Sequence, residues 1–154
     1  MFTIYSLFKF LHVAAVIVWV GGVFTLVVLN ARLAREQNRS AQMALSEQSE
    51  FFGSRVIGPA AITTLLAGII MVLNAGFGFS TLWITWGFVG VFGSIILGAI
   101  FIRRATEELR QVAASPTPDA PRIQALQRRL INLNALNLLL LLSTVGAMVF
   151  KPTL

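Results

Sequence analysis

The amino-acid sequence predicts an all-α membrane protein in which four transmembrane helices form one bundle. Hydrophobic residues make up 56% of the 154 residues and charged residues only 12%, about half the charged fraction of a soluble domain. The mean hydropathy is +0.81, and the hydrophobic residues form long continuous stretches instead of the short alternating segments of a membrane β-barrel. Composition and pattern therefore exclude a water-facing domain and favour helices that cross a lipid bilayer.

Four apolar stretches have about the length that a helix needs to cross the hydrocarbon core of a bilayer, roughly 30 Å thick. We predict the spans at residues 4–29, 56–73, 82–102 and 130–150. All four belong to a single domain, residues 1–154, because four spans and their connections use up a chain of this length.

Local sequence signals predict where the helices begin and bend. Ser40 is the expected cap of a helix that leads into the second span, because a serine side chain accepts from first-turn amides. Gly58 and Pro59 should distort the start of that span, because proline has no N–H to donate. Asp119, followed by Pro121, predicts the capped start of the fourth helix.

Small and polar residues predict how the helices pack, because hydrophobicity cannot draw helices together within lipid. Gly90, Ser94 and Gly98 are spaced four residues apart in the third span, and Ala60, Thr64 and Gly68 have the same spacing in the second. These stripes predict close approach between neighbouring helices. The expected partners of Asn132, Asn134 and Asn137, in the fourth span, are groups on neighbouring helices.

The charged residues predict the orientation of the protein in the membrane. All arginines and all acidic residues lie in two connections, residues 30–55 and 103–129, whereas the connection at 74–81 has no charge. The positive-inside rule then places both charged connections in the cytoplasm and both termini outside a bacterial cytoplasmic (inner) membrane. The net charge of +6 is therefore a topology signal, and no nucleic-acid partner is expected, because the arginines alternate with acids beside the membrane.

His12 is the residue on which a functional prediction depends. The sequence has no cysteine and one histidine, which excludes thiolate zinc, iron–sulfur clusters, covalent c-type haem and a multi-histidine zinc site within the chain. An ionisable side chain within a span is costly and indicates function. Helical spacing places Lys9, His12 and Trp19 along one stripe of the first helix.

The predicted topology brings other candidate ligands to the same leaflet as His12. With both termini outside, Met71 and Met148 lie in the outer half of the membrane, together with Trp83 and Trp86. Imidazole and thioether groups ligate haem iron and copper(I). The alternative interpretation is structural: methionines fill gaps in a core, tryptophans form an aromatic belt, and His12 bonds to a neighbouring helix.

The first helix also resembles a known family. Leu11-His12, followed after six residues by Trp19-Val20-Gly21-Gly22, is similar to a motif in a small bacterial integral-membrane family of unknown function. That family is grouped with the copper-resistance protein D (CopD) and the HemJ-type protoporphyrinogen oxidases. In HemJ-like members the histidine is associated with haem b and tetrapyrrole oxidation, so the resemblance implies an axial-ligand role for His12. CopD relatives are associated with copper movement across the membrane.

Three functional hypotheses follow. In the first, the protein binds haem b non-covalently for redox or haem handling, with His12 as axial ligand and Met71 or Met148 as second ligand. Trp19 would form the pocket wall, and Lys9 would meet a propionate. In the second, His12, Met71 and Met148 bind or transport copper. In the third, the chain is a cofactor-free structural subunit.

The expected partners are the lipid bilayer and either a second copy of the chain, as a homodimer, or a larger membrane complex. The sequence contains no evident set of catalytic residues, and it leaves open whether the protein is an enzyme.

Overall fold

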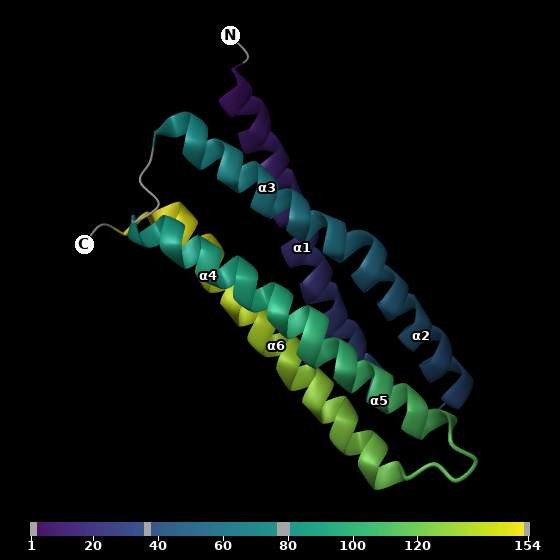
Figure 1. Cartoon of the computed structure of the whole chain (residues 1–154). Coiled ribbons are helices and arrows are strands. Elements are labelled where there is room, and N and C mark those ends of the chain that lie inside the picture. Colours follow the sequence, from purple (N-terminus) through teal and green to yellow (C-terminus); the bar gives the residue numbers. More distant parts are fainter. Residues whose placement is uncertain (1–2, 36–37, 77–80, 153–154) are drawn as a thin grey trace.

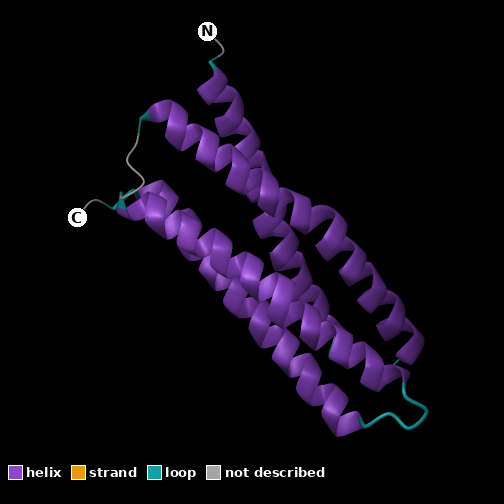
Figure 2. Cartoon of the chain, viewed as in Figure 1, coloured by secondary structure: helices purple, strands orange, loops and turns teal. Residues whose placement is uncertain are grey.

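The computed structural model describes residues 3–35, 38–76 and 81–152, and within them every regular element is a helix (Figure 2). The elements are α1 (Ile4–Leu33), α2 (Arg39–Phe52), the π-helical turn η1 (Gly53–Ile57), α3 (Gly58–Ala75), α4 (Leu82–Ile96), the π-helical turn η2 (Leu97–Ile102), α5 (Arg103–Ala114) and α6 (Ala120–Phe150). Since α2, η1 and α3 are continuous, as are α4, η2 and α5, the described chain forms four long rods (Figure 1). Each contains a stretch long and apolar enough to cross a membrane. The predicted all-α fold with four transmembrane helices is confirmed.

The two predicted helix starts have different outcomes. Asp119 caps α6 as expected, because its side-chain oxygen accepts from the backbone N–H of Arg122 at 3.1 Å. The prediction for Ser40 is wrong. The side-chain oxygen of Asn38 accepts from the backbone N–H of Ser40 at 3.1 Å and from its hydroxyl at 2.7 Å. Asn38 stands just outside the helix, where a short acceptor reaches the first-turn amides, so Asn38 is the cap.

Pro59 is accompanied by the distortion that the sequence predicts, and this distortion is the π-helical turn η1. Proline lacks the N–H that would donate to the carbonyl of Arg55, four residues earlier. The backbone N–H of Gly58 donates to the carbonyl of Gly53, five residues earlier, which is the hydrogen bond of a π-helix. The widened turn therefore lies directly before the proline.

The helices pack unequally around the bundle. α1 packs along α3 and also contacts α6, and α4 runs along α6 (Figure 1). The α3 and α4 helices share the fewest contacts among the pairs that touch, and they diverge in Figure 1 towards the end where the described chain is interrupted between residues 76 and 81. Among the helix pairs that touch, α3 and α4 are therefore the pair with the least backbone approach.

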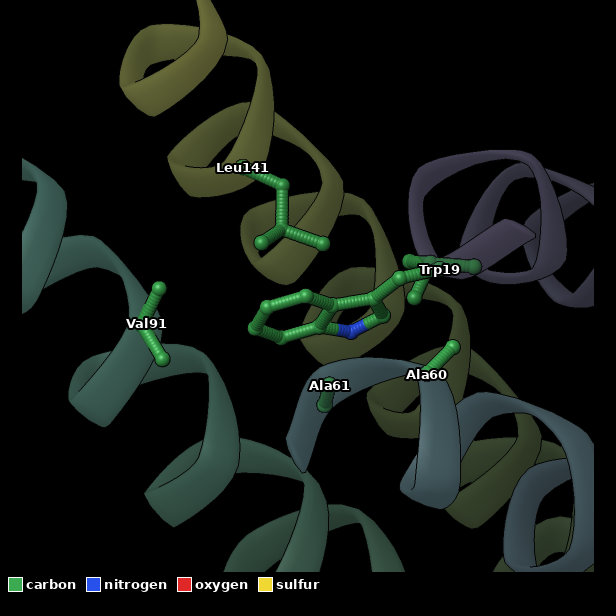
Figure 3. Close-up of a cluster of buried hydrophobic side chains, with 6 residues drawn as sticks. Trp19, Ala60, Ala61, Val91 and Leu141 are labelled. Carbon is green, nitrogen blue, oxygen red and sulfur yellow. The ribbon is translucent and has the colours of Figure 1, made fainter. Parts of the chain in front are cut away.

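A cluster of buried side chains joins all four rods. Its buried members are Trp19, Val23, Ala60, Ala61, Val91 and Leu141. The indole of Trp19 is only 3% exposed and lies between α3, α4 and α6, with the small side chains of Ala60 and Ala61 next to it (Figure 3). Small residues on α3 therefore provide the room that the largest side chain of the cluster needs.

The contact between α4 and α6 is close and partly polar. Gly90 faces Thr144, and a Cβ atom at residue 90 would collide with the threonine side chain. Four residues further along α4, the buried hydroxyl of Ser94 donates to the side-chain oxygen of Asn137 at 2.5 Å. Gly98 has open space around it. The predicted close approach is thus confirmed at Gly90 and Ser94, and it does not extend to Gly98.

The other two asparagines of α6 differ from the prediction. The side-chain amide of Asn134 donates to the carbonyl of Leu130 in its own helix at 2.9 Å, and Asn132 is exposed. The prediction of a bond to a neighbouring helix therefore holds for Asn137 and is wrong for Asn134. An intrahelical bond is available to an asparagine at any depth, because the carbonyl four residues earlier is always within reach.

Candidate functional site

A cavity of about 80 Å³ lies where α1, α3, α4 and α6 meet. The residues that line it include Tyr5, His12, Gly68, Met71, Trp83 and Met148. Most of the remaining lining is apolar, and no Asp, Glu, Lys or Arg lines it. Among the described residues, the side chains on the cavity wall that offer a polar group or sulfur are therefore an imidazole, two thioethers, a phenol, a threonine hydroxyl and an indole.

A hydrogen bond to the backbone of α3 determines which nitrogen of the neutral His12 ring carries the proton. The Nδ1 atom lies 2.8 Å from the carbonyl oxygen of Thr64. A carbonyl oxygen can only accept, so Nδ1 carries the proton and donates it. In the neutral ring the other nitrogen, Nε2, then has a free lone pair. Metal-ligating histidines are usually held in this way, with the non-ligating nitrogen donating to a carbonyl or carboxylate.

Gly68 allows the imidazole to lie against α3. A Cβ atom at residue 68 would be 3.2 Å from Cε1 and 3.3 Å from Nδ1 of His12, closer than ordinary van der Waals contact. Thr64 and Gly68 are one helical turn apart and share a face of α3. The sequence predicted this stripe as a packing surface; the structure shows that it also holds the ring of His12.

Met71 and Met148 line the same cavity as His12. Met71 follows Gly68 by three residues in α3. The methyl group of Met148 occupies the notch that Gly87 leaves in α4. The three residues that the sequence singled out as candidate metal ligands thus line one cavity, and their role as ligands stays a prediction.

The other two candidate residues lie elsewhere. Trp19 is in the buried core cluster described above and does not line the cavity. Lys9 is exposed on α1 and does not line it either. The lysine beside the cavity is Lys151, whose Nζ lies 5.3 Å from the ring centroid of Trp83. Lys151 directly follows the fourth predicted span, residues 130–150, but nothing in the sequence pattern indicated that it would reach α4.

The donor set limits the chemistry of the cavity. Among the described residues there is no group of three or more His, Cys, Asp or Glu side chains that could hold a metal ion. Zinc, calcium and magnesium sites are built mainly from these residue types and from oxygen ligands. The ligands offered here are the imidazole Nε2 of His12 and the sulfur atoms of the two methionines.

Comparison with known proteins establishes the family. The family model described as "Predicted integral membrane protein (DUF2269)" matches residues 6–152. The chain belongs to this family. Membership in DUF2269 agrees with the four helices that are long and apolar enough to span a membrane, so the protein is an integral, multi-pass membrane protein. No curated protein matches the chain, and no solved structure matches it.

Proposed function

We propose that this membrane protein binds copper(I) through Nε2 of His12 and the thioethers of Met71 and Met148. One observation carries the proposal: the Nδ1–Thr64 hydrogen bond leaves Nε2 as the free nitrogen of a histidine in a cavity that two thioethers also line. An ionisable side chain within a span is costly and indicates function by default.

The ligand types favour copper(I) over other metals. Thioether sulfur is a soft ligand that selects copper(I), and imidazole also binds copper. No carboxylate lines the cavity, and the chain has no cysteine. A site with these donors lacks the ligands that hard cations prefer.

The size of the cavity also favours an ion. Pockets that enclose organic ligands of drug size have volumes of about 300–1,000 Å³, whereas this cavity has about 80 Å³. That volume is enough for a metal ion bound by donor atoms on the cavity wall.

Haem b is the second candidate, and the sparse contact between α3 and α4 favours it. The imidazole–thioether pair suits haem iron, and the apolar wall suits a macrocycle, but α3 and α4 would have to separate to admit one. A homodimer that encloses the haem between two copies of His12 would avoid this separation. The first-helix motif resembles both the CopD and the HemJ-like proteins, and so agrees with either ligand.

The proposed location is the cytoplasmic membrane of a bacterium, with both termini outside and the copper site in the outer half. The distribution of charge supports this orientation, because all arginines lie in the two connections at the opposite end from His12. Copper would then be taken up from the outer side or held there.

The test is a copper(I) titration of the purified protein in detergent under reducing conditions, in competition with a chromogenic copper(I) chelator. We expect one copper(I) per chain. His12→Ala should abolish binding, and Met71→Leu and Met148→Leu should each weaken it at least about tenfold. The matched control is Ile69→Leu, which changes the shape of the same cavity wall without removing a donor.

The absorption spectrum of the same preparation distinguishes the candidates. A Soret band that is lost in His12→Ala would support haem b and overturn copper(I). A folded, colourless protein that takes up no copper(I) would overturn both and leave the structural-subunit hypothesis.

A further inference from the structure

We propose that Lys151 determines the charge selectivity of the copper site, so that the cavity accepts monovalent cations and disfavours divalent ones. The inference rests on the proposed copper(I) function. It adds a residue that belongs to no ligand set and acts through its charge.

The backbone at the end of α6 directs Lys151 towards α4. Lys151 directly follows Phe150, the last residue of α6, and has a left-handed backbone with φ of 45°. Its backbone N–H donates to the carbonyl of Ala147 at 2.9 Å, which fixes this turn. The side chain then places its ammonium 5.3 Å from the ring centroid of Trp83, at the start of α4.

Trp83 connects this ammonium to the cavity. Its side chain lines the cavity, as does Met148, three residues before Lys151. A cation over an indole face is attracted by the ring quadrupole, most strongly where water is excluded. Lys151 itself is exposed and does not line the cavity, so its positive charge acts on the cavity from outside, through an indole that does line it.

No negative side chain on the cavity wall compensates this charge. No Asp or Glu lines the cavity, and all six acidic residues belong to the two charged connections at the other end of the bundle. The only other lysine, Lys9, is exposed on α1 and does not line the cavity. A cation that enters the cavity thus meets one fixed positive charge.

The electrostatic free energy with which Lys151 opposes binding is proportional to the charge of the entering ion. For an ion on the far side of the indole, about 10 Å from Nζ, with an effective dielectric constant of about 35, Coulomb's law gives about a fivefold loss of affinity per unit charge. A monovalent ion loses about fivefold and a divalent ion about 25-fold. Lys151 therefore adds about fivefold selectivity for copper(I) over divalent metals, on top of the preference of the soft ligands.

The test compares copper(I) and zinc(II) binding in Lys151→Gln, Lys151→Arg and Lys9→Gln, with the full chain in detergent. Lys151→Gln should raise zinc(II) affinity about 25-fold and copper(I) affinity about fivefold. Lys151→Arg keeps the charge and the cation–π contact, so both affinities should stay within about twofold of the wild type. Lys9, like Lys151, is exposed, but the cation–π contact with the cavity-lining Trp83 belongs to Lys151, so Lys9→Gln should also change little.

Each outcome bears on one proposal. Equal shifts for the two ions, an equal effect of Lys9→Gln, or weaker copper(I) binding in Lys151→Gln would overturn the selectivity inference and leave the copper site standing. The last result would indicate an anionic ligand such as a haem propionate. If zinc(II) binds to none of the proteins, the copper(I) affinity of Lys151→Gln tests the inference: a rise of about fivefold supports it, and no rise overturns it. A wild-type protein that binds neither ion overturns the proposed function itself.

Discussion

Gly68→Ala separates the positioning of His12 from the stability of the bundle. The new Cβ would lie 3.2 Å from Cε1 and 3.3 Å from Nδ1 of His12. The ring must then move by a few tenths of an ångström, away from the face of α3 that holds it. This movement stretches the bond from Nδ1 to the Thr64 carbonyl, now 2.8 Å long.

The expected effects on stability nearly cancel. A hydrogen bond of this kind contributes about 1 kcal/mol net, and replacing glycine by alanine inside a helix gains about 1 kcal/mol. The free energy of unfolding of Gly68→Ala should therefore stay within about 1 kcal/mol of the wild type. Loss of the partner that orients a ligating histidine typically weakens metal binding by about 10–100-fold, so copper(I) affinity should fall about tenfold.

The assay combines chelator competition for copper(I), unfolding by denaturing detergent, and ¹⁵N NMR of the imidazole. The wild-type spectrum should show the proton on Nδ1, and this signal should shift in Gly68→Ala. Gly21→Ala is the matched control, because a Cβ at residue 21 meets nothing within 4 Å; its copper affinity should not change. Copper affinity of Gly68→Ala within twofold of the wild type, in a protein where His12→Ala abolishes binding, would show that the contact of His12 with α3 does not position the ligand.

Three further predictions concern the bundle and its orientation. Trp19→Ala empties the middle of the core cluster and should destabilise the protein by about 3 kcal/mol, as measured by detergent unfolding. Its copper(I) affinity, measured by chelator competition, should not change. A large loss of affinity would place Trp19 at the copper site. Gly90→Ala forces α4 away from Thr144 and should cost about 2–3 kcal/mol, which Thr144→Ala should partly restore, whereas Gly98→Ala, in open space, should cost nothing. A reporter enzyme fused to the carboxy terminus should behave as periplasmic and one inserted in the connection at 103–129 as cytoplasmic; the reverse result would invert the proposed orientation.

Several features of the fold follow from the sequence because they depend only on residues that are close together along the chain. Length of apolar runs determines the number of helices that can span a membrane, and this prediction agrees with the structure. Asp119 and Pro59 act on the backbone within one turn, so their effects are local and predictable. Ser40 was misassigned because Asn38 offers an equally good acceptor two residues earlier, and short-range rules do not rank neighbouring caps.

The order of the spans along the chain predicts that His12, Met71 and Met148 lie at a similar level of the bundle. Alternating the direction of successive spans fixes the level of each residue along the bundle, and these three are predicted to share the half that holds both chain termini. Depth does not determine which way a side chain faces. The structure adds that all three turn towards one cavity.

The rotation of each helix about its axis and the choice of neighbours were decided only by the tertiary structure. His12 and Trp19 share one stripe of α1, yet the first lies against Gly68 beside a cavity and the second fills the core next to Ala60. A straight stripe on a helix that crosses its neighbours meets different partners at different depths. The sequence by itself determined the class of fold and the residue types available to a ligand. Packing decided that Thr64 fixes the proton of His12 and that Lys151 reaches Trp83, because both contacts join residues far apart in the chain.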